Sequence, residues 1–375
     1  NQSNRNTPRG LADVVVGNTA ICTVGHEGVG LSYYGYSIDD LATKASFEEV
    51  AFLLLHGELP RKSQLDEFVS ALISKRSIPK DLKTVLETIP GSAHPMDVLR
   101  TACSVLGTLE PEKAFSEQTL IAYRLLALFP AILVYWYRYH TEGVRIDTML
   151  DVPTTGDYFL QLLSGKKVDK IYTDAMNVSL ILYAEHEFNA STFAARVTAS
   201  TLSDFYSAVV AAIGTLRGPL HGGANEAAMA LIESFDTPEN VETQLRKALD
   251  RKEKIMGFGH RVYKNCDPRS ASIKNISKRL SQHVGDKKIY AISEVIESTL
   301  WQQKKLFPNL DFYSASAYYF MQIPVSLYTP IFVCSRITGW AAHIMEQRRD
   351  NALIRPGSTY VGPKPRQYIN IDKRI

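Results

Sequence analysis

Two histidines set among glycines are the residues best placed in the sequence to do chemistry. His221 lies within residues 218–225, where a helix beginning near Asn225 would offer free backbone N–H groups. His260 directly follows the glycine-rich residues 257–259. Because glycine lets the backbone approach a ligand closely, each histidine could direct a ring N–H at a substrate oxygen. For His221, an ordinary helix–helix turn with an incidental histidine is an equally good interpretation.

A carboxylate stands in an apolar and aromatic setting at residues 308–314. Asp311 lies there between Leu310 and Phe312. Burial among such neighbours would raise the pKa of Asp311 and make it a competent base. Taken alone, the segment favours a simpler interpretation, in which Asp311 caps a helix after the loop that contains Pro308.

Positive charge is concentrated in one block of the chain. Residues 246–279 hold eleven Lys and Arg and three Asp and Glu, a net charge of +8, whereas the other residues sum to −5. Such a block around a Gly-x-Gly turn suits an anionic ligand, because backbone N–H groups and nearby cations can hold phosphates. A solvated basic helix face would have the same composition. The turn does not continue into a dinucleotide fingerprint, and the chain has no P-loop motif.

Composition and spacing disfavour several other classes of function. The chain has 375 residues, 45% of them apolar and 22% charged, as expected for a globular protein of about two domains. A net charge of +3 is too small to indicate a nucleic acid or a membrane surface as a partner. The four cysteines are far apart, and neither an H-E-x-x-H nor a G-x-S-x-G motif occurs. We therefore expect no metal site, no disulfide framework and no serine hydrolase.

The elements that must position these residues are mainly helices. Strand-like residues 19–24 and 31–36 around a glycine-rich turn predict one short N-terminal β-hairpin. Helical patterns with capping residues and breaks then follow. They lie at residues 37–41, 47–56 (closed by Gly57), 63–75, 80–88, 116–140, 157–163 and 192–214.

Two further segments have a distinctive composition. The apolar residues 125–137 are fewer than the ~20 that a membrane span needs, so they predict a buried helix with a kink or break at Pro130. Residues 348–375 contain three prolines and predict an extended arm that lies against its own subunit or a partner. The polar residues 1–10 have no apolar core, so we expect no signal peptide.

Together, the three candidate segments resemble the catalytic segments of the citrate synthase family. Residues 218–225, 257–269 and 308–311 occur in the order of that family, and the likeness extends over nearly the whole chain, including Ser335-Arg336. The resemblance implies a mainly α fold with a large helical domain, a smaller mobile helical domain and one short N-terminal hairpin. The large domain would comprise residues 1–222 and 326–375, including the C-terminal arm, and the small domain residues 223–325.

The resemblance also implies roles for individual residues. Asp311 would be the base that removes the α-proton of an acyl-CoA, His221 would stabilise the enol or enolate, and His260 would polarise the ketone of oxaloacetate. The residues that would bind oxaloacetate are His186, Arg269, Arg336 and Arg355, with Arg355 contributed across the interface of a homodimer. The CoA thioester would be a co-substrate, with no tightly bound cofactor. It would contact Lys254, Ile255, Met256, Gly257 and Phe258.

The acyl group is indicated by further segments. Residues 313–318, 337–343 and 346–351 look more like 2-methylcitrate synthases, which use propionyl-CoA, than like housekeeping citrate synthases. One extra methyl group is worth only ~1–3 kcal/mol in a pocket, so acetyl-CoA as the substrate, or dual specificity, stays open. A helical binding protein that has lost the chemistry is a remote alternative. We expect a bacterial cytoplasmic enzyme, with the mitochondrial matrix as the second choice, and neither a nucleic-acid nor a membrane partner.

Overall fold

Helices make up almost all of the regular structure. The computed structural model describes residues 9–11, 14–25 and 30–374, and sixteen α-helices lie within them, so the predicted mainly α fold is confirmed. The helices before the His221 segment are α1 (Ile38–Lys44), α2 (Phe47–His56), α3 (Lys62–Ser74), α4 (Lys80–Thr88), α5 (Pro95–Leu109), α6 (Gln118–Glu142), α7 (Thr155–Ser164), α8 (Lys170–Tyr183), α9 (Ala190–Ser200) and α10 (Phe205–Leu216). Short 3-10 turns lie at Arg9–Leu11, Phe115–Glu117, Val325–Leu327 and Ile371–Lys373.

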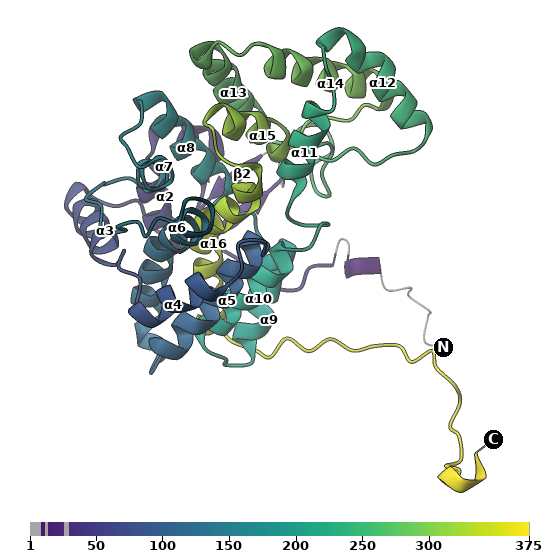
Figure 1. Ribbon diagram of the computed structural model, residues 1–375. Coiled ribbons are helices and arrows are strands. Elements are labelled where there is room, and N and C mark those ends of the chain that lie inside the picture. The colour runs from purple at the N-terminus through teal and green to yellow at the C-terminus, as the bar shows by residue number, and fades with distance from the viewer. Residues whose placement is uncertain (1–8, 12–13, 26–29, 375) are drawn as a thin grey trace.

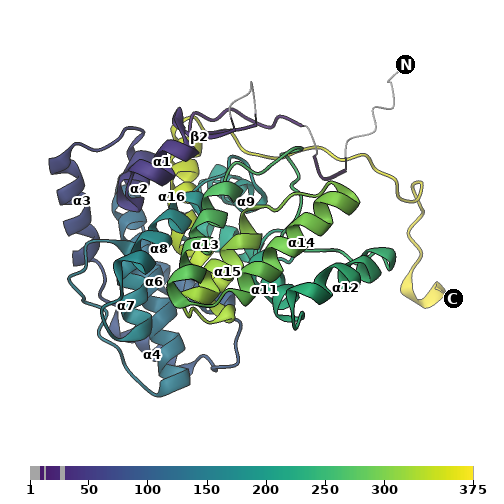
Figure 2. The same ribbon diagram turned by 90° about the horizontal axis from the view of Figure 1, so that it is seen from above.

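The next five helices gather on one side of the molecule, at the top of Figure 1. Within this group α13 and α11 pack on α15, and α12 packs on α14. The same helices lie together in the second view (Figure 2). They are α11 (Ala224–Glu233), α12 (Pro238–Asp250), α13 (Ser270–Val284), α14 (Lys288–Lys304) and α15 (Leu310–Phe320).

The last helix lies at the centre of the helices outside this group. In α16 (Tyr328–Arg349) every residue from Tyr328 to Met345 is buried. It contacts α2, α5, α6, α8, α9 and α10, which surround it (Figure 1). A helix buried on all sides carries apolar residues around its whole circumference, so any charged residue on it needs a specific reason to be there.

A small antiparallel sheet lies near the N-terminus. The strands β1 (Cys22–Val24) and β2 (Leu31–Tyr33) form the predicted hairpin, although its turn residues 26–29 lie outside the described part of the chain. The prediction of a single hairpin is incomplete, because β3 (Tyr36–Ser37) pairs with the other edge of β2. Tyr34 and Gly35 both have positive φ values (47° and 84°), which is the backbone of a tight two-residue hairpin turn.

The predicted helix over residues 192–214 is wrong in one respect, because the structure divides it into α9 and α10. Leu202 adopts a left-handed conformation (φ 65°) between them. Asp204 then caps α10, its carboxylate accepting a hydrogen bond from Ser207 N (3.0 Å). The Ala and Val pattern stops at Ala199 and resumes at Ala208, and Asp204 between them is a local capping signal that the prediction overlooked.

The long apolar helix is part of the protein interior. Residues Phe115–Glu142 are long and apolar enough to cross a membrane by length and composition, but 78% of their most apolar window is buried inside the protein. The prediction of a buried helix is therefore confirmed. The helix runs through Pro130 without interruption, so a break at that residue is excluded.

The C-terminal residues form an extended arm that leaves the helical body (Figures 1 and 2). The arm is anchored where it begins, since Ile354 N donates to Ser200 Oγ (3.1 Å). Beyond that point its apolar side chains are exposed, among them Tyr360, Val361 and Tyr368. The arm therefore exposes apolar side chains that its own subunit does not cover, as a surface that binds another protein does.

Candidate active site

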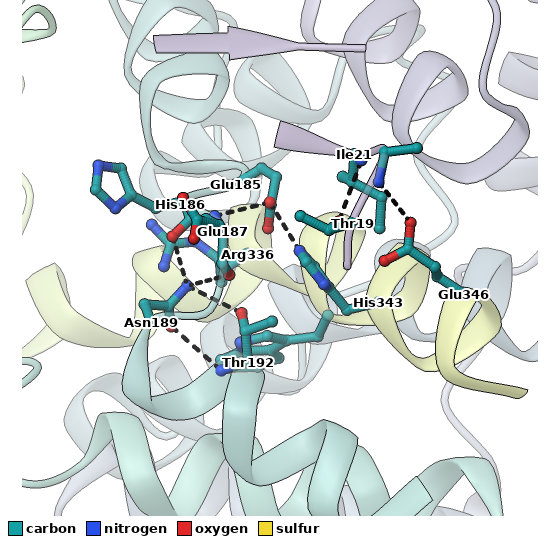
Figure 3. Close-up of polar contacts among 12 residues, drawn as sticks. Thr19, Ile21, Glu185, His186, Glu187, Asn189, Thr192, Arg336, His343 and Glu346 are labelled. Atoms are coloured by element: carbon teal, nitrogen blue, oxygen red, sulfur yellow. Dashed lines mark hydrogen bonds and ion pairs between the residues drawn. The ribbon is translucent and has the colours of Figure 1, made fainter. Parts of the chain in front are cut away.

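The loop between α8 and α9 forms the centre of the site (Figure 3). It carries His186, which is buried and whose Nε2 is 3.0 Å from the hydroxyl of Tyr263. The His186 ring also lies 5.1 Å from the ring of His260, between centroids. Burial and the nearby guanidinium of Arg269 hold the pKa of His186 well below its usual range, so this side chain is neutral at pH 7.

His221 lies in the turn between α10 and α11, as the glycine pattern suggested. A side chain at Gly222 would overlap the carbonyl oxygen of Leu216, so only glycine fits beside His221. The Nε2 atom of His221 accepts a hydrogen bond from Ser191 N (3.2 Å) and lies 2.8 Å from Ser191 Oγ. Burial and the charge of Arg336 lower the pKa of His221 to about 4. The ring is therefore neutral at pH 7, with its proton on Nδ1.

His260 is held in the opposite way. Its Nδ1 accepts hydrogen bonds from Val262 N (3.0 Å) and Tyr263 N (3.2 Å). Burial, followed by the charge of Arg269, lowers the pKa of His260 to about 4. The neutral ring therefore carries its proton on Nε2, which donates to no residue in the described ranges and can donate to a ligand.

A backbone bridge joins the predicted CoA segment to the start of α15. Gly259 N donates to Phe307 O (2.8 Å) and Asn309 N donates to Gly257 O (2.9 Å). Gly257 has a φ of 87°, and a Cβ there would crowd Phe312. Of the predicted CoA-binding residues, Lys254, Ile255, Met256, Gly257 and Phe258, the bridge holds the last two beside the helix that carries Asp311.

Asp311 lies in the first turn of α15 and does not cap that helix. Asn309 is the N-cap, and its Oδ1 accepts a hydrogen bond from Asp311 N (3.0 Å), so the capping interpretation of Asp311 is wrong. The Oδ1 atom of Asp311 accepts a hydrogen bond from the hydroxyl of Tyr183 (2.7 Å). Burial raises the pKa of Asp311, and this hydrogen bond and the cations Arg269 and Arg336 partly oppose the rise.

Two buried arginines supply positive charge. Arg269 forms a two-pronged ion pair with Asp267, with Nε–Oδ1 and Nη2–Oδ2 distances of 2.9 Å. Asp267 Oδ2 also accepts from Leu310 N (3.0 Å), which links this arginine to α15. Arg336 on α16 donates through Nε to the carbonyl of Tyr183 (2.6 Å). Burial lowers the pKa of Arg336 to about 10, so it remains cationic at neutral pH.

The structure brings most of the predicted site residues together. Arg336 influences the pKa values of His186, His221 and Asp311, and His186 contacts His260. Arg355 is different, since it lies exposed in the arm, where its Nη1 donates to Pro356 O (2.9 Å). A single chain therefore does not bring Arg355 to the other predicted residues.

Sequence reasoning missed the partners that orient these groups. Tyr183, Ser191 and Asp267 hold Asp311, His221 and Arg269 respectively. Asp267 is two residues from the arginine that it holds, so a local Asp-x-Arg pattern could have suggested it. Tyr183 and Ser191 contact residues that are distant in the chain, and no spacing reveals such contacts.

A cavity of about 450 Å³ lies elsewhere, between α4 and the residues that follow α6. It contains none of the candidate site residues. Glu87 and Arg145 on its wall are already paired with each other (2.6 Å), so we assign it no ligand. Within the described ranges, no three His, Cys, Asp or Glu side chains are grouped closely enough to hold a metal ion.

Comparison with known proteins identifies the class to which this fold and site belong. Residues 10–357 match the family described as "Citrate synthase, C-terminal domain", so the chain belongs to the citrate synthase family. The 2-methylcitrate synthase of Shewanella oneidensis is 57% identical over 368 residues, which cover 98% of each chain. Citrate synthase 2 of Bacillus subtilis is 42% identical, covering 98% of this chain and 99% of its own. The predicted family is confirmed.

A solved structure is similar in the same way. The ternary complex of carboxymethyl coenzyme A and oxaloacetate with the citrate synthase of Thermoplasma acidophilum is 34% identical to this chain. The match covers 97% of this chain and 98% of that one, with a TM-score of 0.91. The predicted citrate synthase-like fold is therefore confirmed as well.

Proposed function

We propose that the protein condenses propionyl-CoA with oxaloacetate and water to give 2-methylcitrate and CoA. The observation that carries this proposal is the arrangement of two neutral histidines and the carboxylate of Asp311 around two buried arginines, since Arg336 lies near His221, Arg269 near His260, and both near Asp311. Each histidine has one ring N–H that donates to no residue in the described part of the chain. The 57% identity to a 2-methylcitrate synthase favours propionyl-CoA. Acetyl-CoA, as used by a citrate synthase, is the second candidate, because relatives of that name are also similar over the full chain.

The mechanism begins with removal of a proton from the weakly acidic α-carbon of the thioester. Asp311, whose pKa is raised by burial, takes that proton. The Nδ1–H of His221 donates to the thioester oxygen and stabilises the developing enol or enolate. A preorganised donor of this kind lowers the barrier by ~3 kcal/mol. The enol carbon then attacks the ketone carbon of oxaloacetate, whose oxygen receives a hydrogen bond, and then a proton, from Nε2 of His260. Hydrolysis of the resulting thioester makes the overall reaction irreversible.

Oxaloacetate is a dianion and needs fixed cations. Arg269 and Arg336 supply two of them, and the planar guanidinium suits a carboxylate. His186 donates a further hydrogen bond, and Arg355 reaches in from the other subunit of a homodimer. The CoA phosphates lie near residues 254–258, within the block of net charge +8.

The substrate assignment is tested by following thiol release with oxaloacetate and each acyl-CoA in turn. We expect a higher kcat/KM for propionyl-CoA than for acetyl-CoA. A clear preference for acetyl-CoA would select the citrate synthase alternative. No thiol release with either thioester would contradict an enzyme of this family and favour the non-catalytic binding protein.

We also propose that residues 223–325 form a small domain that closes over the substrates against residues 1–222 and 326–375. Glycines 222 and 223 lie at one boundary between the two parts, and glycines 257 and 259 lie inside the small domain; we propose that they supply flexible joints, and three of the four have positive φ values. Small-angle scattering should give a smaller radius of gyration with oxaloacetate and a CoA analogue than without ligands. Identical profiles would contradict closure.

Because similar chains come from bacteria, we propose the bacterial cytoplasm as the location of this protein.

A further inference from the structure

Glu185 is a buried carboxylate beside the site for which the proposed mechanism has no role. Its side chain is fully buried. Its Oε2 accepts hydrogen bonds from Glu187 N (2.9 Å) and from His343 Nε2 (2.8 Å). Its Oε1 has no hydrogen-bond partner among the described residues. Keeping such a group inside a protein is costly unless a compensating charge lies nearby.

Arg336 supplies that charge and needs one itself. Its guanidinium is buried and donates to a backbone carbonyl, but it forms no ion pair with a carboxylate in the described part of the chain. Figure 3 shows Glu185 with Arg336 on one side and His343 on the other. Burial alone would raise the pKa of Glu185, yet His343 and Arg336 together hold it below its usual range. Each of the two buried charges therefore stabilises the other.

The hydrogen bonds of Glu185 continue into a chain of contacts that extends away from the site. Arg196 Nε donates to His343 Nδ1 (2.9 Å), so the N–H of His343 that points at Glu185 is on Nε2. Arg196 also pairs with Glu346, whose Oε2 accepts from Ala20 N (2.9 Å). This chain ties α9, the end of α16 and the segment before β1 to the loop between α8 and α9.

We propose that Glu185 is a positioning residue for oxaloacetate, whose fixed negative charge holds Arg336 and the loop with His186 in the geometry that binds the keto acid. The proposal rests on the proposed function, since it takes oxaloacetate as the ligand. Glu185 acts through Arg336 and not by contact, because a carboxylate that faced a dianion directly would repel it.

The substitution Glu185→Gln isolates the charge. Glutamine keeps the size and an oxygen that can accept from Glu187 N and His343, and its NH₂ group takes the position of the unpartnered Oε1. We expect the dissociation constant of oxaloacetate, measured by calorimetry without acyl-CoA, to rise about 10-fold, as for the loss of one charge-assisted interaction. The KM of propionyl-CoA at saturating oxaloacetate should change less than about twofold, because Glu185 positions residues that bind oxaloacetate and not the thioester.

The matched control is Glu346→Gln at the outer end of the same chain of bonds. It should lower the melting temperature and leave the dissociation constant of oxaloacetate within about twofold, since it does not adjoin Arg336. An unchanged dissociation constant in folded Glu185→Gln would overturn the proposal. Should that variant not fold, Glu185→Asp withdraws the carboxylate by one methylene, and an unchanged constant there would overturn the proposal too.

The proposed function fails in a different way. A parent protein that binds oxaloacetate but releases no CoA from either thioester contradicts the proposed enzyme. The calorimetric comparison of the parent with Glu185→Gln still decides the role of Glu185 in that case.

Discussion

The two candidate catalytic histidines are held in opposite tautomers. His221 accepts at Nε2 from Ser191, whereas His260 accepts at Nδ1 from Val262 and Tyr263. With pKa values of about 4, both rings are neutral throughout the physiological range. Each therefore presents one N–H whose direction is set by backbone donors on the far side of the ring. Backbone donors do not titrate, so the tautomers should persist from about pH 5 upward.

The role of Asp311 as the base is tested by Asp311→Asn. Asparagine keeps the size of the side chain but cannot accept a proton, so we expect kcat to fall by about 10²–10⁴-fold, the range for loss of a general base. Calorimetry should find the dissociation constant of oxaloacetate largely unchanged, because Arg269 and Arg336 remain in place. Unchanged turnover would remove Asp311 from the mechanism.

The hydroxyl of Tyr183 should set the pH at which that base becomes active. Its hydrogen bond to Asp311 favours the carboxylate and opposes the rise in pKa that burial causes. In Tyr183→Phe that opposition is lost, so the pKa of Asp311 should rise further and a larger fraction should be protonated at a given pH. The acid limb of the kcat profile should therefore move to higher pH. A limb that stays in place or moves to lower pH would show that Tyr183 does not tune the base.

At the scale of helices and loops, the sequence predicted those helix ends that are determined by contacts between neighbouring residues. Ser37 caps α1 by accepting from Asp40 N, and Gly57 ends α2 in a left-handed conformation, as their spacing predicted. The interruption between α9 and α10 has a local signal in Asp204, but distant residues also support it. Asn351 Nδ2 donates to Ser200 O (3.1 Å), a contact between segments 151 positions apart.

In the candidate site, too, local features could be predicted from the sequence and long-range contacts could not. Histidines framed by glycine are visible in the sequence because the glycines are required locally, as at Gly222 beside His221. The orienting partners are not visible, since Tyr183 and Asp311 are 128 positions apart. Arg336 was predicted from the family resemblance alone, because nothing in the pattern of α16 shows which of its residues face the site.

The close approach of α16 to the end of α8 gives a test at this scale. A Cβ at Gly339 would overlap the carbonyl oxygen of Ala184 and lie 2.8 Å from Glu185 Oε1. Gly339→Ala should therefore destabilise the protein by about 1–3 kcal/mol, the usual cost of overpacking. The measurement is urea unfolding followed by circular dichroism.

Gly214 provides the matched control for that substitution. It lies near the end of α10, where a Cβ would project into open space. Gly214→Ala should stabilise the protein by about 0.5–1 kcal/mol, because alanine loses less backbone entropy in a helix than glycine. If both substitutions had the same effect, the close approach would not be what requires glycine at position 339.

At the scale of the whole molecule, the arm is the feature that one subunit does not explain. It extends away from the helical body with its apolar side chains exposed (Figure 1). Arg355, the predicted fourth oxaloacetate-binding residue, lies on this arm, apart from Arg269 and Arg336. A homodimer with two-fold symmetry resolves both facts, since each arm can then cover its partner and bring Arg355 to the partner's site.

Mixing two inactive variants tests whether Arg355 acts across the interface. Arg355→Ala lacks a substrate cation and Asp311→Asn lacks the base, so each homodimer should have little activity. In a mixed dimer, the subunit with an intact Asp311 would receive an intact Arg355 from its partner. One of the two sites of the dimer would then be complete. Random pairing gives half mixed dimers, so refolding equal amounts together should restore about a quarter of the parent activity. If Arg355 served its own subunit, no mixed dimer would contain a complete site, and activity would stay at the level of the separate variants.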